Sequence, residues 1–284
     1  MSRTPFDQLA KQLFEELLQP FGEVQISLEV PGESHLVDIY FAPIAKHLRG
    51  RITKRNQDRS ALGLLGEMIT SPCLFEPFRN PPSPSDYHRC KLKQEWIIAD
   101  FYRQRNQSLS LEELPILWII SPTLSQNFLT SAGAVAKEDW CQGVYWKAEM
   151  DRCGLIAVHQ LPKTPETLWL RLLGKGNVQQ QAIQEVMALP EADQRREEAL
   201  RLLSNWKMII ETFPQIEQEE GALTMALSQA FLEWEEKTKQ EAKQQAKREI
   251  ALNLLRAGMS AEQISQFTGL SADIVENLRQ QIGE

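Results

Sequence analysis

The feature that most constrains this chain is a carboxylate set inside each of two apolar stretches. The first stretch is Ser34–Phe41, which carries Asp38, and the second is Pro72–Arg79, which carries Glu76. A carboxylate within an apolar strand is costly unless it is paired or bound to a metal. Mg²⁺ is commonly held by one or two carboxylates together with phosphate oxygens and water. The two stretches therefore predict successive strands that carry a candidate site for a hard cation, although Asp38 also fits a strand-end acid bonded to nearby backbone.

The residues around Asp38 predict a helix followed by a hairpin. Apolar residues recur at helical spacing from residue 6 to residue 21, and two β-type stretches follow at 24–30 and 35–41. On the second stretch Leu36, Asp38 and Tyr40 share one face. Glu16 lies at the margin of the apolar face of the helix, where it would reach a site on the sheet below. A solvated helix acid is the alternative interpretation of Glu16.

A basic segment lies between the two acidic strands. Residues 42–60 contain a single acid, Asp58, against six basic residues, which are Lys46, Arg49, Arg51, Lys54, Arg55 and Arg59. The whole chain has a formal net charge of −7, so it is no general binder of polyanions, and contact with nucleic acid requires a local basic patch. The segment suits phosphate contacts. A solvated loop explains the same charges equally well.

The rest of the first half alternates between helices and strands. We expect helices at 61–70 and 86–104, a strand around Glu76, a strand at 115–121 that is buried on both faces, and a strand at 155–161. After Pro165 the pattern changes to helix after helix. This order predicts an α/β fold, with a mixed α+β sheet flanked by helices and an all-helical C-terminal extension.

Composition describes an ordinary soluble globular protein. Hydrophobic residues make up 42% of the chain and charged residues 24%. The four cysteines show no metal-ligand spacing and no disulfide framework, which favours reduced thiols. No apolar run approaches the ~18 residues of a membrane span, and the N-terminus lacks the pattern of a signal peptide. We expect a cytoplasmic protein without a membrane partner.

The last forty residues predict two short helices joined by a tight turn. Ser260 and Gln263 form a capping box, Ile264 and Phe267 supply an apolar face, and Gly269 ends the first helix. This is a helix-turn-helix pattern. The second helix carries more acidic than basic residues, so a packing or oligomerisation unit is at least as well supported as a DNA reader. The charged helix before it, 233–249, is also typical of self-association.

The order of elements and the tail resemble a known family. The acids on the second and third strands match the core of the PD-(D/E)XK nuclease superfamily, which has a restriction-endonuclease-like fold. The segment Leu254–Ser271 resembles the recombination-promoting nuclease (Rpn)/transposase branch of that superfamily. The resemblance implies that Asp38 and Glu76 hold Mg²⁺, or Mn²⁺ in its place, with Glu16 as the helical acid, and that DNA is the substrate.

One position departs from the family pattern. The family has Glu-x-Lys, whereas Glu76 is followed by Pro77 and Phe78. A bulge at Pro77 would turn Arg79 onto the face of Glu76, because proline cannot donate to a strand ladder. Alternatively, Lys91 or Lys93 on the following helix would project into the site. Arginine stays protonated, so Arg79 would stabilise charge on phosphate but could not act as a base.

Two functions follow from these residues. The first is an Mg²⁺-dependent DNA endonuclease, in which the metal activates a water that attacks the phosphodiester, and Arg79, Lys91 or Lys93 stabilises the developing charge. The second is a catalytically decayed nuclease fold that acts as a DNA-binding or assembly module and forms homo-oligomers through its C-terminal helices. The predicted domains are a nuclease-like core at 1–164, a helical extension at 165–240 and a charged helix with the helix-turn-helix tail at 241–284.

Overall fold

The structure, a computed structural model, describes residues 5–29, 36–43, 59–105, 109–190 and 243–282, together with isolated residues between 193 and 240. Seven strands form one mixed sheet in the order β1-β2-β3-β4-β7-β6-β5. Strand β4 pairs in parallel with β3 and with β7, and the remaining pairs are antiparallel. The strands are β1 (Gly22–Glu29), β2 (Leu36–Pro43), β3 (Cys73–Pro77), β4 (Ile116–Ser121), β5 (Val135–Ala136), β6 (Val144–Trp146) and β7 (Cys153–Ala157).

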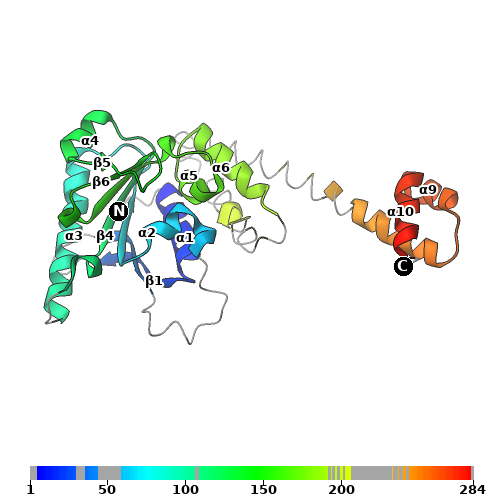
Figure 1. The fold of residues 1–284 in the computed structure, drawn as a ribbon, viewed down its shortest axis with the longest axis horizontal. Helices are drawn as coiled ribbons and strands as arrows, with labels where there is room; N and C mark the ends of the chain where they lie inside the picture. Colours follow the sequence, from blue (N-terminus) through cyan, green and yellow to red (C-terminus); the bar gives the residue numbers. More distant parts are fainter. Residues whose placement is uncertain are drawn as a thin grey trace. The chain divides into compact units, whose positions relative to one another are not determined.

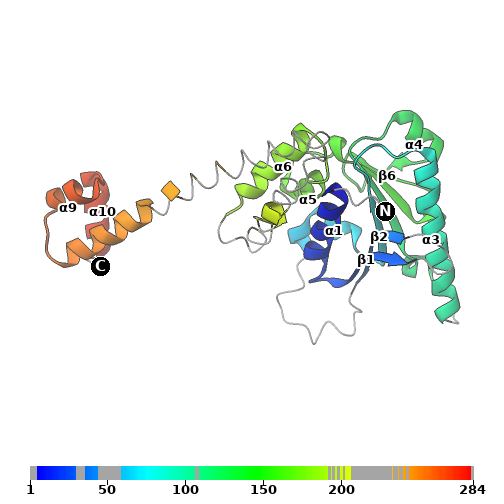
Figure 2. The same cartoon turned by 180° about the vertical axis from the view of Figure 1, so that it is seen from behind.

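Helices cover both faces of the sheet (Figures 1 and 2). One face carries α3 and α4, and the other carries α1 and α2. The helices of the first compact unit include α1 (Pro5–Leu18), α2 (Leu64–Met68), α3 (Pro84–Arg105), α4 (Gln126–Ala132), α5 (Leu168–Arg171) and α6 (Asn177–Met187). This arrangement confirms the predicted α/β core with flanking helices.

Each face of the sheet has its own apolar layer. On the α1 face, the ring of Phe14 packs on that of Phe75 with 4.5 Å between the ring centroids. On the α3 face, side chains from the central strands pack against α3 and α4, among them Leu74, Leu117, Ile119 and Leu155. All six residues of β4 are buried, as expected for a central strand covered on both sides. Burial of both faces explains why β3 and β4 are continuous apolar runs interrupted only by Glu76.

The structure corrects one predicted strand and adds two. Strand β7 ends at Ala157, and residues Val158–Gln160 form a short 3-10 helix, so His159 does not lie on a strand. Strands β5 and β6 were not predicted, because two and three residues are too few to show an alternating pattern. The predicted helix at 61–70 is divided into a 3-10 turn, Arg59–Leu62, and α2.

The chain divides into two compact units, of which Met1–Leu227 is the first and Ser228–Glu284 the second. Residues 243–256 are helical and precede α9 (Ala261–Thr268) and α10 (Ala272–Ile282). Ser260 and Gln263 form the predicted capping box, and Gly269 ends α9 with a left-handed backbone. Of the two residues predicted to form the apolar face of α9, one is buried and the other is exposed. Ile264 is buried, but Phe267 is 75% exposed, because Thr268 takes the inner position and donates its hydroxyl to the carbonyl of Ile264.

Two further properties concern the described part of the chain. The cysteines Cys73, Cys90, Cys141 and Cys153 are all free, and Cys141 alone among them is not buried. None of the helices that the structure describes combines the length and the apolar character needed to cross a membrane.

The domain boundaries predicted from the sequence stay a prediction, and truncation of the chain tests the boundary near residue 240. A chain that ends near residue 240 should keep the secondary structure of the unit Met1–Leu227, because the sheet and its flanking helices lie within that unit. We expect Tm to change by no more than about 4 °C, the shift that roughly 1 kcal/mol produces in a domain of this size. Circular dichroism of the shortened and full-length chains measures this. Loss of the sheet signal on truncation would show that the tail is required for the core.

Candidate metal and phosphate site

The pairing of β2 with β3 brings the two strand carboxylates together. Ile39 lies opposite Phe75, and Tyr40 lies opposite Leu74. Asp38 and Glu76 are the next residues along the two strands, one position beyond the paired segment. The backbone N–H of Asp38 donates to Oε1 of Glu76 at 3.4 Å. The two acids therefore lie on successive strands, as predicted, and they contact each other directly.

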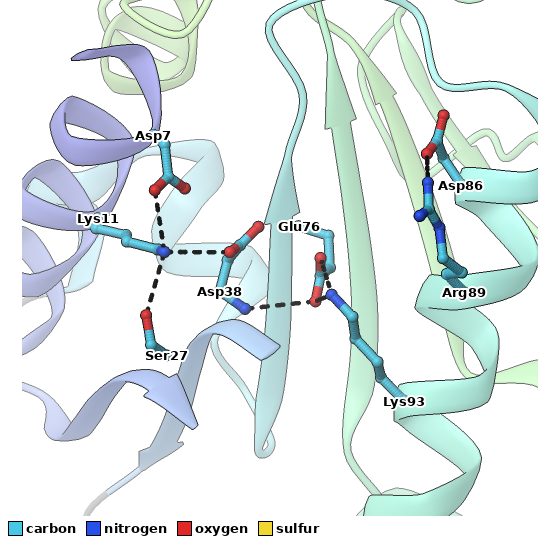
Figure 3. A network of polar contacts seen from close by, with 8 residues as sticks. All are labelled: Asp7, Lys11, Ser27, Asp38, Glu76, Asp86, Arg89 and Lys93. Carbon is cyan, nitrogen blue, oxygen red and sulfur yellow. Dashed lines mark hydrogen bonds and ion pairs between the residues drawn. The ribbon is translucent and has the colours of Figure 1, made fainter. Parts of the chain in front are cut away.

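Glu76 is buried and holds an ammonium group from a helix. Only 3% of its surface is exposed. The Nζ of Lys93, on α3, donates to both carboxylate oxygens of Glu76, at 2.8 and 2.9 Å (Figure 3). A buried carboxylate without such a partner would cost several kcal/mol, so the lysine is what allows Glu76 to be charged there.

The two members of this pair have shifted pKa values. Burial raises the pKa of Glu76 to about 7; the ammonium of Lys93 opposes this rise, and the carboxylate of Asp38 adds to it. For Lys93, burial alone would lower the pKa, but the Glu76 carboxylate outweighs burial, so the pKa is raised. Lys93 therefore keeps its proton at neutral pH, while Glu76 titrates near neutrality.

Asp38 carries its own ion pair, with a residue that the sequence did not single out. The Nζ of Lys11, on α1, lies 3.2 Å from Oδ1 of Asp38. Figure 3 shows Lys11 and Lys93 approaching the two carboxylates from different helices. In this structure each acid of the site thus pairs with one lysine, and Lys11 is shared between Asp38 and Asp7. Lys11 stands four residues after Asp7 on a polar helix face, which is also the pattern of an ordinary solvated lysine.

Of the two predicted lysines of α3, the structure brings Lys93 to Glu76 and directs Lys91 elsewhere. The Nζ of Lys91 donates to Oε1 of Gln94 at 2.6 Å and to the carbonyl of Asp151 at 3.0 Å. Residues two positions apart on an α-helix are about 200° apart around its axis, so the side chains of Lys91 and Lys93 cannot reach the same site.

Arg79 is likewise directed away from Glu76. Its Nη1 donates to the carbonyl of Gly174 at 2.8 Å and to Gln179 at 3.3 Å. The bulge that would have turned it toward the site is absent from the described strand, because Glu76 and Pro77 pair consecutively with Ile119 and Ile120 of β4.

The remaining predicted residues lie outside the cluster or outside the described residues. Glu16 is half-buried on α1, about 140° around the helix axis from Lys11, which is the α1 residue that contacts Asp38. Arg59 donates to the carbonyl of Ile69 at 3.1 Å and closes the turn before β3. The other five basic residues of the segment lie outside the part of the chain that the structure describes. They are Lys46, Arg49, Arg51, Lys54 and Arg55.

The donor set is suitable for a hard cation. Asp38 and Glu76 offer carboxylate oxygens from neighbouring strands, which matches the one or two carboxylates with which Mg²⁺ is commonly bound. Within the described ranges, no group of three or more His, Cys, Asp or Glu side chains is arranged as a metal site. A bound Mg²⁺ would therefore take its other ligands from water and phosphate, and Mn²⁺ would be held in the same way.

A comparison with models of protein families finds one match, in the C-terminal part of this chain. Residues 244–280 match the family model described as the C-terminal helix-turn-helix domain of the Rpn/YhgA-like nuclease family. This match confirms the predicted resemblance to the Rpn branch, on the segment that carried it. No curated protein and no solved structure gives a significant match.

The raised pKa of Glu76 predicts how stability depends on pH. A carboxyl group whose pKa is raised on folding stabilises the fold below its unfolded pKa, near 4.5, and loses this contribution as the pH rises through about 7. Relative to Glu76→Gln, the wild type should lose on the order of 3 kcal/mol over that interval, since each pKa unit corresponds to about 1.4 kcal/mol.

Denaturant unfolding of both proteins between pH 4.5 and 7.5 measures this difference. In the wild type Lys93 remains protonated throughout this range, because the Glu76 carboxylate raises its pKa, so it adds no pH dependence there. A difference in free energy of unfolding that stays constant with pH would contradict the raised pKa of Glu76.

Proposed function

We propose that this chain, whose residues 244–280 match the C-terminal helix-turn-helix domain of the Rpn/YhgA-like nuclease family, is a metal-dependent DNA endonuclease with its site at Asp38, Glu76 and Lys93. The observation that carries the proposal is the bidentate contact of Lys93 with a buried Glu76 that lies next to Asp38. It gives the cluster the two acids and the lysine of the family pattern, although the lysine comes from α3 instead of from β3.

The residues of the cluster have distinct roles in this proposal. Asp38 and Glu76 would hold Mg²⁺ or Mn²⁺, which when bound supplies activation of water and neutralisation of phosphate charge. Glu76 must be ionised to do so, and its raised pKa makes cation affinity increase as the pH passes about 7. Lys93 keeps its proton, so it would stabilise negative charge on the phosphate and would not act as the base.

DNA contact is assigned to two separate segments. The match at residues 244–280 supports a helix-turn-helix that contributes to DNA binding. Helix α10 is poorly charged for this task, since Asp273 and Glu276 outnumber Arg279, and Arg279 pairs with Glu276 at 3.7 Å. The basic segment follows β2 in the sequence, and β2 ends at Pro43, roughly 16 Å of strand from Asp38. We assign most of the affinity to its lysines and arginines.

A second function is favoured by one observation. Both acids already pair with a lysine, so each carboxylate has an ionic partner without a metal. A chain with this site would also serve as a non-catalytic DNA-binding or assembly module. Catalysis distinguishes the two functions.

Replacement of either acid tests the endonuclease. Asp38→Asn and Glu76→Gln preserve shape but remove the charge that holds the cation, so each should abolish Mg²⁺- or Mn²⁺-dependent cleavage of plasmid DNA. Lys93→Met should reduce the cleavage rate by about 10²- to 10³-fold, as loss of one stabilising donor does in other enzymes. Lys91→Met is the matched control, because this lysine lies on the same helix and contacts Asp151 instead of Glu76.

EDTA and circular dichroism accompany each assay, so that loss of metal and loss of folding are separated from loss of catalysis. Cleavage by the acid variants at the wild-type rate would place the activity in another site or another protein. A folded wild type that cleaves no form of DNA would favour the non-catalytic module.

The salt dependence of DNA binding tests the basic segment. Changing Lys46, Arg49, Arg51 and Lys54 together to glutamine should flatten the plot of log affinity against log salt, by about 0.9 for each duplex phosphate that the protein no longer neutralises. Lys243→Gln with Arg248→Gln, in the tail, is the parallel variant. A slope that changes only in the tail variant would assign phosphate binding to the helix-turn-helix unit.

A further inference from the structure

Lys11 is held by oxygen atoms from three parts of the chain. Its Nζ lies 3.2 Å from Oδ2 of Asp7, 3.2 Å from Oγ of Ser27 and 3.2 Å from Oδ1 of Asp38 (Figure 3). An ammonium group has three N–H donors, so the number of acceptors matches the number of donors. The three contacts fix a side chain that would otherwise be free to rotate, and they tie α1 to both β1 and β2.

Ser27 reaches Lys11 through an unusual backbone conformation. Its φ of 57° lies in the left-handed region, which costs a residue other than glycine about 1–2 kcal/mol. Ile26 pairs with Ile39, and Leu28 pairs with Val37, but the pair between them, Ser27 and Asp38, is missing from the ladder. The one strained residue of β1 therefore lies directly opposite Asp38, and its hydroxyl contacts the lysine that holds Asp38.

The contact engages one oxygen of the Asp38 carboxylate. Lys11 pairs with Oδ1, and among the described residues Oδ2 has no ion pair or hydrogen bond. A carboxylate that is hydrogen-bonded through one oxygen is fixed in its rotamer and can offer the other oxygen to a cation. Such supporting contacts to metal ligands typically contribute 10- to 100-fold to metal affinity.

We propose that Lys11 is the positioning residue of Asp38, which it orients for a divalent cation. This inference rests on the proposed function, since it concerns the same cation. Lys11 also lines an open cleft of about 280 Å³ with Asp7, Glu15 and Ser27. The cleft leaves the Lys11 and Asp38 side chains partly exposed, at 17% and 29%.

The sign of the effect on metal affinity separates this role from simple electrostatics. Removal of a positive charge near a cation site should tighten cation binding if Lys11 only repels or competes with the metal. If Lys11 orients Asp38, its removal should weaken binding. Lys11→Met keeps the length of the side chain and removes the ammonium group. Lys91→Met removes a comparably shielded lysine that does not contact Asp38.

Mn²⁺ binding by the full-length protein, followed by electron paramagnetic resonance without DNA, gives the readout. We expect a Kd about 10- to 100-fold higher for Lys11→Met, and no weakening for Lys91→Met. Ser27→Gly, which suits a positive φ but lacks the hydroxyl, should fall between wild type and Lys11→Met. An unchanged or lower Kd for Lys11→Met would overturn the inference.

A wild type that binds no Mn²⁺ would contradict the proposed cation site. The positioning of Asp38 by Lys11 is then tested separately, by a crystal structure of metal-free Lys11→Met. In that case displacement of the Asp38 carboxylate from its wild-type position would support the positioning role. An Asp38 carboxylate that stays in place without Lys11 would overturn it.

Discussion

The ion pair between Glu76 and Lys93 is the interaction on which the site depends. Glu76 lies in a strand that is otherwise apolar, and loss of its partner would leave a buried charge at a cost of about 3–5 kcal/mol. Lys93 reaches it because the next residue, Gln94, is fully buried and donates to the carbonyls of Pro115 and Arg152, at 3.2 and 2.8 Å. These two bonds fix the rotation of α3 over the sheet. Helix α3 thus supplies the lysine that the sequence of β3 lacks.

The sequence predicted the parts of the site that follow from local patterns. A carboxylate inside an apolar strand is visible from its neighbours alone, and both Asp38 and Glu76 were identified in this way. The choice between Lys91 and Lys93 was not available from the sequence, because it depends on the rotation of α3, which the bonds of Gln94 determine. Lys11 could not be identified either. Its contact with Asp38 requires the packing of α1 on the sheet and the left-handed Ser27, and neither leaves a periodic signal.

In the C-terminal unit, too, the features set by neighbouring residues were predictable and those set by packing were not. Its caps were predictable, since Ser260, Gln263 and Gly269 act within one helix. The exposure of Phe267 was not, because Thr268 replaces it on the inner face through a bond to the backbone. The match to the Rpn/YhgA-like helix-turn-helix domain lies in this unit, at residues 244–280. The acids and lysines of the candidate site all lie in the unit Met1–Leu227, so the family match and the candidate site belong to different compact units.

The central claim is that the cluster of Asp38, Glu76 and Lys93 is a divalent-cation site and not only a pair of structural salt bridges. Anomalous diffraction from crystals of the full-length protein soaked in Mn²⁺ above pH 7, where Glu76 is ionised, tests it most directly. The account predicts an anomalous peak within coordination distance of both the Asp38 and the Glu76 carboxylates, with the Lys93 ammonium displaced from at least one oxygen of Glu76. The absence of a peak, with Lys11 and Lys93 still paired as in Figure 3, would contradict the account.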